Sequence, residues 1–165
     1  PKDDKVVCLG TMNPYKELEK LVDVFNANGM KLEIAGKFLD QQRYLDLQHR
    51  AKDNVIVENV VLSEDDYYKK LAGAKYSILP YDMKVYEGRT SGVLLESIFV
   101  GTIPIAPKRL LEENEVRGIG YDTLQELLES SFFNKIRVEK EENLLIDKNM
   151  IKGAIYDWLC GIVNG

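Results

Sequence analysis

One stretch decides the fold class, residues 91–106, which read SGVLLESIFVGTIPIA. Ser91 is a favourable helix N-cap, and the leucine and isoleucine residues after it recur at helical spacing. Gly101 is suited to end this helix, because glycine readily adopts the left-handed conformation. The β-branched run at 103–106 then predicts a short buried strand. A helix that leads directly into such a strand indicates an α/β domain.

The same alternation continues on both sides of this unit. Strands are predicted at residues 5–9, 31–35, 55–58, 76–79, 103–106 and 117–121. Helices are predicted at 18–26, 40–52, from 63 onward, and at 91–100, 122–130 and 147–163, with a polar loop at 81–90 and irregular chain at 134–143. This order predicts a Rossmann-like three-layer α/β/α sandwich with a mainly parallel sheet of about six strands. We expect residues 1–165 to form a single domain.

The composition excludes several classes of protein. Of the 165 residues, 45% are apolar and 30% are charged, as in globular proteins. The net charge of -5 comes from interleaved acidic and basic residues, which argues against nucleic-acid binding. No stretch approaches the ~20 apolar residues of a membrane-spanning helix, and no signal peptide is visible, so we expect a cytoplasmic protein. The chain begins with Pro1 instead of Met, so we expect a fragment or a processed form of a longer protein.

Few side chains are arranged as metal ligands. Cys8 and Cys160 lie far apart, which indicates a reducing compartment, and Cys8 sits in an apolar run that predicts burial. The acidic residues after Ser63 open a predicted helix, where they complement the helix dipole. His49 lies in a polar helical stretch and is expected to be exposed. We therefore expect neither a metal nor a cofactor.

The start of the helix at 91–100 is a candidate anion site, because ligands of an open parallel sheet bind beyond the carboxyl ends of its strands. Gly92 would present bare backbone N–H groups at the helix tip, where the helix dipole attracts a phosphate. Glu96 lies four residues later on the same helix face, about 5–6 Å away. That separation suits a phosphate joined to a ribose, whose hydroxyls can donate to the carboxylate. The alternative is that Glu96 is an ordinary solvated helix residue.

The predicted loop after the first strand supports the same interpretation. Gly10 permits a tight turn, and Lys16 lies at the sheet edge that also carries Gly92, where an ammonium could contact a diphosphate. The alternative is that Lys16 is a surface lysine. The loop has neither the GxxxxGK[ST] spacing of a P-loop nor the GxGxxG of dinucleotide enzymes, which argues against NAD or FAD.

Taken in order, these segments resemble the carboxyl-terminal domain of group 1 glycosyltransferases, which have the GT-B fold. The matching blocks are VCLG at 7–10 with Lys16 six residues later, LEIAG at 32–36, the NV block at 54–60 with its following helix to Ala74, ILPY at 78–81, SGVLLE at 91–96 and GTIPIA at 101–106. The matches run from residue 5 to about 125, which is most of the chain. Their order and spacing carry the resemblance, because each block alone is common.

The resemblance implies a retaining, metal-independent transferase whose donor is a nucleotide-diphosphate sugar, UDP- or GDP-linked, bound as a substrate. By matching position, Glu96 would bind ribose, the amides near Gly92 the diphosphate, and Val60 would flank the base. Lys16 would stabilise the departing phosphate. The complete donor-binding set is Gly10, Thr11, Gly36, Val60, Arg89, Thr90, Ser91, Gly92, Val93 and Glu96, and the catalytic candidates are Lys16 and Glu87.

Two positions depart from the family pattern. The family has two glutamates separated by seven residues, and Gly88 occupies the earlier position, with Glu87 one residue away. Thr11 stands where the family has an arginine, and Arg89 is the candidate that would supply this charge from the other loop.

The resemblance also implies partners. The acceptor site and any general base would belong to an amino-terminal domain that this chain lacks, so the fragment should be inactive alone. The acceptor would be a glycan or a lipid-linked molecule in surface polysaccharide synthesis, and the intact enzyme would associate peripherally with the inner face of the membrane.

Two other functions stay open. One is a nucleotide-sugar 2-epimerase or phosphorylase half, although an epimerase needs further carboxylates near the sugar and only Glu87 is available. The other is a non-catalytic doubly wound regulatory module of the receiver type, with acidic residues at 3–4 and Lys108 after the fifth strand. A receiver needs an aspartate at the end of its third strand, where residues 58–59 read Glu-Asn.

Overall fold

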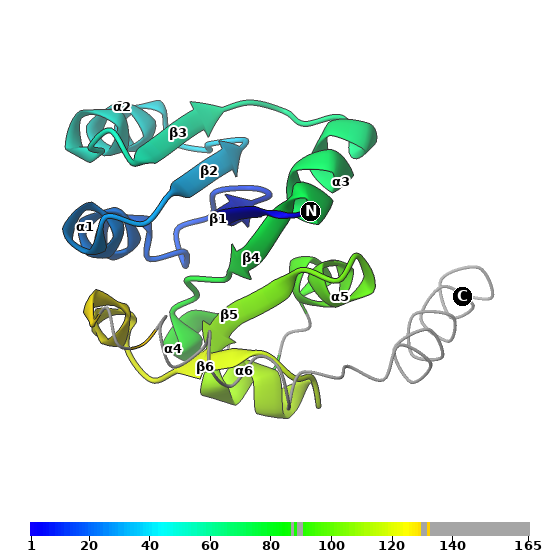
Figure 1. Ribbon diagram of the computed structural model, residues 1–165. Helices are drawn as coiled ribbons and strands as arrows, with labels where there is room; N and C mark the ends of the chain where they lie inside the picture. Colours follow the sequence, from blue (N-terminus) through cyan, green and yellow to red (C-terminus); the bar gives the residue numbers. More distant parts are fainter. Residues whose placement is uncertain (87, 89–90, 130–131, 133–165) are drawn as a thin grey trace.

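A six-stranded sheet forms the middle layer of the computed structural model, which describes residues 1–86, 88, 91–129 and 132 (Figure 1). Its strands are β1 (Asp3–Leu9), β2 (Leu32–Gly36), β3 (Val55–Asn59), β4 (Ala74–Ile78), β5 (Ile103–Pro107) and β6 (Ile119–Tyr121). Their order is β3-β2-β1-β4-β5-β6, and every neighbouring pair is parallel. The predicted parallel sheet is confirmed, and its strand order reverses between β1 and β4.

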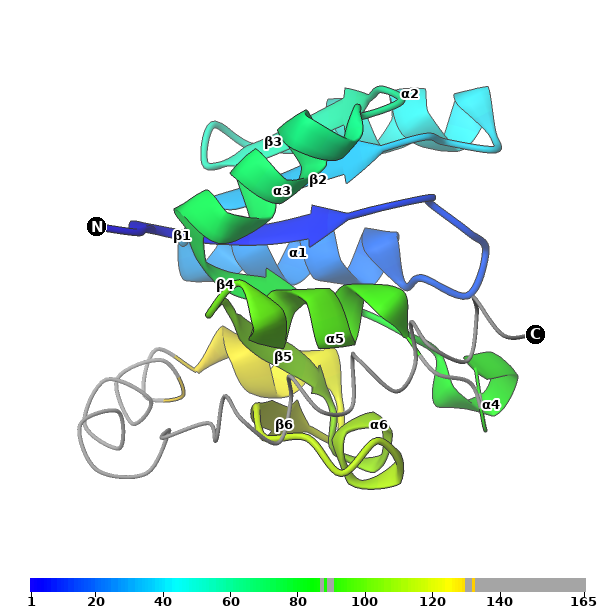
Figure 2. The same ribbon diagram turned by 90° about the vertical axis from the view of Figure 1, so that its right-hand side faces the viewer.

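Helices cover both faces of this sheet. They are α1 (Leu18–Asn28), α2 (Gln41–Arg50), α3 (Glu64–Gly73), α4 (Met83–Tyr86), α5 (Gly92–Phe99), α6 (Lys108–Glu113) and the 3-10 helix η1 (Leu124–Leu128). In Figure 1, α1, α2 and η1 lie on one side of the sheet and α3 and α5 on the other, and Figure 2 shows α3 and α5 in front with α1 behind. The predicted three-layer sandwich is therefore confirmed. Among the described helices, none is long and apolar enough to cross a membrane.

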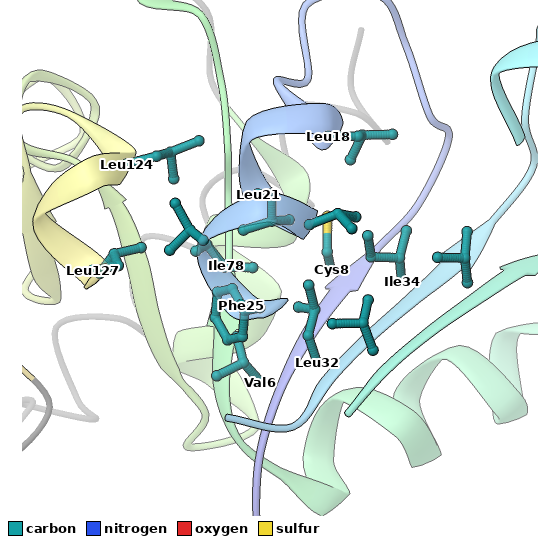
Figure 3. Packing of buried hydrophobic residues seen from close by; sticks show 14 of the residues in the cluster. Val6, Cys8, Leu18, Leu21, Phe25, Leu32, Ile34, Ile78, Leu124 and Leu127 are labelled. Carbon is teal, nitrogen blue, oxygen red and sulfur yellow. The ribbon is translucent and has the colours of Figure 1, made fainter. Parts of the chain in front are cut away.

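Alternate residues of β1 enter the two cores that these layers create. Val6 and Cys8 pack toward α1, where Phe25 is fully buried (Figure 3). Val7 and Leu9 face the other way and pack against Leu71 of α3. A central parallel strand is buried on both faces, which is why this run is apolar throughout. Cys8 is 1% exposed, so its predicted burial is confirmed.

Local signals at several helix ends act as the sequence predicts. The Ser63 hydroxyl accepts a hydrogen bond from the backbone N–H of Asp66 at 3.1 Å and caps α3. Gly29 and Gly101 follow α1 and α5 with φ of 73° each, the left-handed conformation that ends a helix. His49 is an exposed residue of α2, as predicted.

Three expectations about local structure were wrong. The predicted loop at 81–90 contains α4, whose first turn is bonded to the Asp82 backbone carbonyl and carboxylate. Helix α6 follows β5 at residues 108–113, where no helix was predicted. The segment at 122–130 forms the short 3-10 helix η1, at whose start the Glu126 carboxylate accepts from the backbone N–H groups of Asp122 and Thr123. The regions predicted as irregular at 134–143 and helical at 147–163 lie outside the described residues.

Candidate functional site

The loop after β1 and the segment after β4 meet where the strand order reverses. The N–H of Glu17 donates to the carbonyl of Pro80 at 2.7 Å, and the N–H of Asp82 donates to the carbonyl of Tyr15 at 2.8 Å. Lys16 lies between these two bonds, in an isolated antiparallel bridge with Tyr81. Ligands of doubly wound sheets bind beyond the carboxyl ends of the strands at such a reversal. We refer to this place as the switch point.

Two glycines allow the loop after β1 to cross the end of β2. Gly10 has φ of 97°, a left-handed value that favours glycine. A Cβ atom at the buried Gly36 would lie 1.8 Å from the carbonyl oxygen of Gly10. The backbone contact therefore explains why residue 36 is glycine, and a donor contact of Gly36 stays a prediction.

Lys16 is a buried cation at the switch point. The residue is 3% exposed, so the alternative of a surface lysine is wrong. Its Nζ donates to the carbonyl oxygen of Leu9 at 3.0 Å, which uses one of its three N–H donors. Burial lowers the pKa of this ammonium, and no carboxylate among the described residues offsets that cost by an ion pair. An anionic ligand would supply the missing negative charge.

Gly10 also leaves space between Lys16 and α5. A Cβ atom at Gly10 would lie 3.7 Å from Nζ of Lys16 and 3.8 Å from Cγ2 of Val93. The bare backbone of Gly10 therefore borders both the buried ammonium and the first turn of α5. The structure thus brings the predicted site residue Val93 next to Gly10 and Lys16, which lie far from it in the sequence.

The tip of α5 is open on the side of Gly92. The buried Ser91 hydroxyl accepts from the backbone N–H of Leu94 at 3.3 Å and lies 3.1 Å from the hydroxyl of Tyr81. Gly92 is exposed, and no described residue accepts a hydrogen bond from its N–H or from that of Val93. These N–H groups are the unpaired donors that every helix start leaves. They are available to an anion.

Glu96 reaches back toward this tip. A Cβ atom at Gly92 would lie 3.9 Å from Oε1 of Glu96. Among the described residues, and apart from the backbone of α5 itself, it would have no other neighbour within 4 Å. The other carboxylate oxygen, Oε2, accepts a hydrogen bond from the hydroxyl of Tyr67 in α3. Burial raises the pKa of Tyr67, and the hydrogen bond to Glu96 adds to this shift, so the phenol stays protonated. Glu96 is half-buried and held by a partner that sequence reasoning missed, because Tyr67 lies 29 residues away.

Solved structures share this arrangement of layers and strands. The C-terminal domain of a group 1 family glycosyl transferase, LpcC, from Francisella tularensis matches with a TM-score of 0.63 over 86% of this chain and 77% of that chain, at 9% identity. The fold is that of a GT-B carboxyl-terminal domain. Within this GT-B likeness, AviGT4, a glycosyltransferase involved in avilamycin A biosynthesis, matches with a TM-score of 0.56 and 16% identity. The match covers 99% of this chain and 53% of AviGT4, so the chain spans about half the length of that enzyme.

A third GT-B match is to a structure that holds ligands. The catalytic domain of starch synthase IV from Arabidopsis thaliana, bound to ADP and acarbose, has a TM-score of 0.55 and 17% identity over 92% of this chain and 34% of that chain. No family model and no curated protein sequence matches the chain. The likeness therefore establishes the GT-B fold, whereas the chemistry of the site depends on its own residues.

Two of the remaining predicted residues, Val60 and Thr11, follow strands of the sheet. Val60 follows β3, and its N–H donates to the carbonyl of Gly36 at 3.0 Å. Thr11 is exposed in the loop after β1. Three predicted residues lie outside the described residues, namely Glu87, Arg89 and Thr90.

Sequence reasoning also missed an aromatic cluster that fixes the segment after β4. The ring of Tyr81 lies 4.3 Å from that of Tyr86 and 5.5 Å from that of Tyr15, measured between centroids. Nζ of Lys16 lies 6.0 Å from the Tyr81 ring, within reach of a cation–π interaction. The sequence does show tyrosines in the loop after β1 and in the segment after β4. Their spacing along the chain does not reveal that these two segments contact each other.

Val60 lines a hollow of the GT-B domain to which neither Lys16 nor Gly92 contributes. That hollow, of about 770 Å³, runs along the edge strand β3 and the helix α3. Two of the lysines that line it are paired: Lys5 contacts Glu33 at 2.8 Å, and Lys70 contacts both Glu33 and, at 3.2 Å, Glu58. Because Lys5 and Lys70 already have carboxylate partners, these two cations need no ionic ligand. Within the described part of the chain, no three His, Cys, Asp or Glu residues are grouped as a metal would require.

The receiver-type alternative is wrong. Receivers have the strand order 2-1-3-4-5, whereas this sheet continues on both sides of β1 in the order 3-2-1-4-5-6. Asp3 and Asp4 lie exposed at the amino end of β1, opposite to the edge where the ligand of such a sheet binds. The carboxyl end of β3 carries Asn59, whose side chain accepts from the N–H of Phe38 at 3.0 Å.

Proposed function

We propose that this chain is the donor-binding domain of a glycosyltransferase, and that it binds the nucleoside diphosphate of a nucleotide sugar at the switch point. The observation that carries this proposal is the buried Lys16, which has no described carboxylate partner and faces the open tip of α5 across Gly10. A buried ammonium is costly unless an anion offsets it. The diphosphate of a nucleotide sugar would supply such an anion.

The diphosphate would lie between Lys16 and the first turn of α5. The ammonium has donors left after its bond to Leu9, and the N–H groups of Gly92 and Val93 point from the positive end of the helix. Gly10 and Gly92 carry no side chain that would obstruct the phosphates. Charge on the leaving diphosphate would be stabilised by these donors during transfer, without a requirement for a metal.

The ribose would follow the diphosphate along α5. The carboxylate of Glu96 lies one turn below Gly92 and can accept hydrogen bonds from two vicinal hydroxyls. Val60, at the same edge of the sheet, would flank the base. The ADP in the starch synthase IV structure supports a nucleoside diphosphate as the ligand class.

The transfer itself would need parts beyond these residues. We propose that Glu87, Arg89 and Thr90 contact the sugar and phosphates, that the reaction retains the anomeric configuration, and that Thr11 borders the phosphates. The acceptor, a glycan or a lipid-linked molecule, would bind to an amino-terminal domain that closes over the switch point. The fragment alone would then bind donor without transferring sugar.

Titration of the ¹⁵N-labelled chain with UDP, GDP and ADP tests donor binding. We expect amide shifts at Gly10, Lys16, Gly92 and Val93 with at least one nucleotide, and weaker shifts with the matching monophosphate. Inorganic phosphate at the same concentration serves as the control for a general anion effect. The absence of shifts at these residues with all three nucleotides at millimolar concentration would contradict the proposal.

A further inference from the structure

Tyr67 is the described partner of the Glu96 carboxylate. It donates from α3 to Oε2, while Oε1 faces the open space at Gly92. No described cation pairs with Glu96, which distinguishes it from Glu33 and Glu58 with their lysine partners. A carboxylate has about four acceptor positions, and one phenol occupies only one of them. The bond therefore orients Glu96 and leaves Oε1 available to further donors.

The position of Tyr67 is itself well determined. Its ring packs at the border of the core formed by β1 and α3, beside the fully buried Leu71. The ring of Tyr68 contacts it edge to face at a centroid distance of 5.3 Å. Ser63 caps the helix one turn earlier. These contacts hold the Tyr67 hydroxyl within hydrogen-bonding distance of Glu96 in α5. The orientation of the Glu96 carboxylate is therefore fixed before a ligand binds.

We propose that Tyr67 is a positioning residue that holds Oε2 of Glu96, so that Oε1 is presented to the vicinal hydroxyls of a ribose and the site selects ribonucleotides over deoxyribonucleotides. This inference rests on the proposed function. A site that hydrogen-bonds a substrate hydroxyl discriminates strongly against the analogue that lacks it. The discrimination depends on a fixed carboxylate, since a mobile one loses part of its binding energy in being ordered. The raised pKa of Tyr67 means that it remains a hydrogen-bond donor throughout the neutral range.

The test measures the dissociation constants of a nucleoside diphosphate and of its 2′,3′-dideoxy analogue for the full chain. The nucleotide used is the one of UDP, GDP and ADP that binds most tightly. We expect Tyr67→Phe to weaken binding of the ribonucleotide by roughly 10- to 150-fold, the range expected for one hydrogen bond to a charged group. Binding of the dideoxy analogue should change by less than about twofold, because its sugar has no hydroxyls for Glu96. Tyr68→Phe, which keeps both rings and the Glu96 bond, is the matched control and should leave both constants unchanged.

A double-mutant cycle with Glu96→Gln separates positioning from general support of the fold. In the Glu96→Gln background, Tyr67→Phe should cost little further affinity, because the carboxylate that it positions is gone. If Tyr67→Phe does not fold, Glu96→Asp moves the carboxylate away from Tyr67 while keeping its charge, and it should show the same selective loss for the ribonucleotide.

The outcomes separate the two proposals. Absence of nucleotide binding by the unaltered chain contradicts the proposed function. The role of Tyr67 alone is contradicted if the unaltered chain binds the nucleotide normally and Tyr67→Phe loses the same affinity for the ribonucleotide and its dideoxy analogue. It is likewise contradicted if Tyr67→Phe loses no affinity for either. Unchanged ribonucleotide affinity in Glu96→Asp also overturns it.

Discussion

A Cβ atom at Gly36 would lie 1.8 Å from the carbonyl oxygen of Gly10. The end of β2 and the turn that leaves β1 are thus in direct backbone contact, beneath the loop that carries Lys16. The loop is further tied to β2 by the N–H of Met12, which donates to the carbonyl of Lys37 at 2.9 Å. The position of the buried ammonium therefore depends on the absence of a side chain in the neighbouring strand.

Gly36→Ala should destabilise the chain, because its methyl group cannot be accommodated without moving the backbone of Gly10. We expect a loss of about 1–3 kcal/mol in the free energy of unfolding, measured by urea denaturation. Gly73→Ala is the matched control, since a Cβ atom there meets nothing within 4 Å at the end of α3. Equal stability of the two variants would contradict the close approach of β1 and β2.

Lys16→Met should separate binding from stability. Replacing a buried ammonium by an apolar side chain of similar length should leave the free energy of unfolding unchanged or raise it. Affinity for a nucleoside diphosphate should fall by at least about tenfold, the effect of one bond between a charged group and a phosphate. Calorimetric titration and thermal melting give the two quantities. Lys20→Met, at an exposed lysine one turn later, is the control and should change neither.

The pH dependence of stability should carry a signature of Lys16. Burial lowers its pKa from 10.5 in the folded chain, so between the lowered value and 10.5 the unfolded chain binds a proton that the folded chain does not. The free energy of unfolding therefore rises with pH in this window. We expect the unaltered chain to gain stability relative to Lys16→Met as the pH rises toward 10.5. Parallel curves for the two proteins would argue that Lys16 is not buried as described.

Gly92→Ala should stabilise the fold and weaken binding at once. Among the described residues, the new methyl group would meet only Oε1 of Glu96, at 3.9 Å, outside the backbone of its own helix, and alanine favours the helix by up to about 1 kcal/mol. The same methyl group would stand where the phosphate approaches the helix tip. Thermal melting and nucleotide titration check both effects. Gly73→Ala again provides the comparison, with no effect on affinity expected; unchanged affinity in Gly92→Ala would contradict the position of the diphosphate.

Local features of the chain could be predicted well from the sequence. The strand expected at 103–106 is β5 (Ile103–Pro107), and the cap expected at Ser63 holds the N–H of Asp66. These features depend on neighbours within one helical turn or on a run of β-branched residues, which the sequence displays directly. Helices α4 and α6 were missed because four and six residues are too short to show a period.

The sequence by itself determined the six strands and their order along the chain, the parallel sheet, and the spacing that puts Glu96 one turn below Gly92. Only the tertiary structure decided that Lys16 is buried and that Tyr67 reaches Glu96. The physical reason is distance along the chain. Helical spacing relates residues four apart through backbone geometry, whereas the pairing of α3 with α5 depends on how two helices pack on the same face of the sheet.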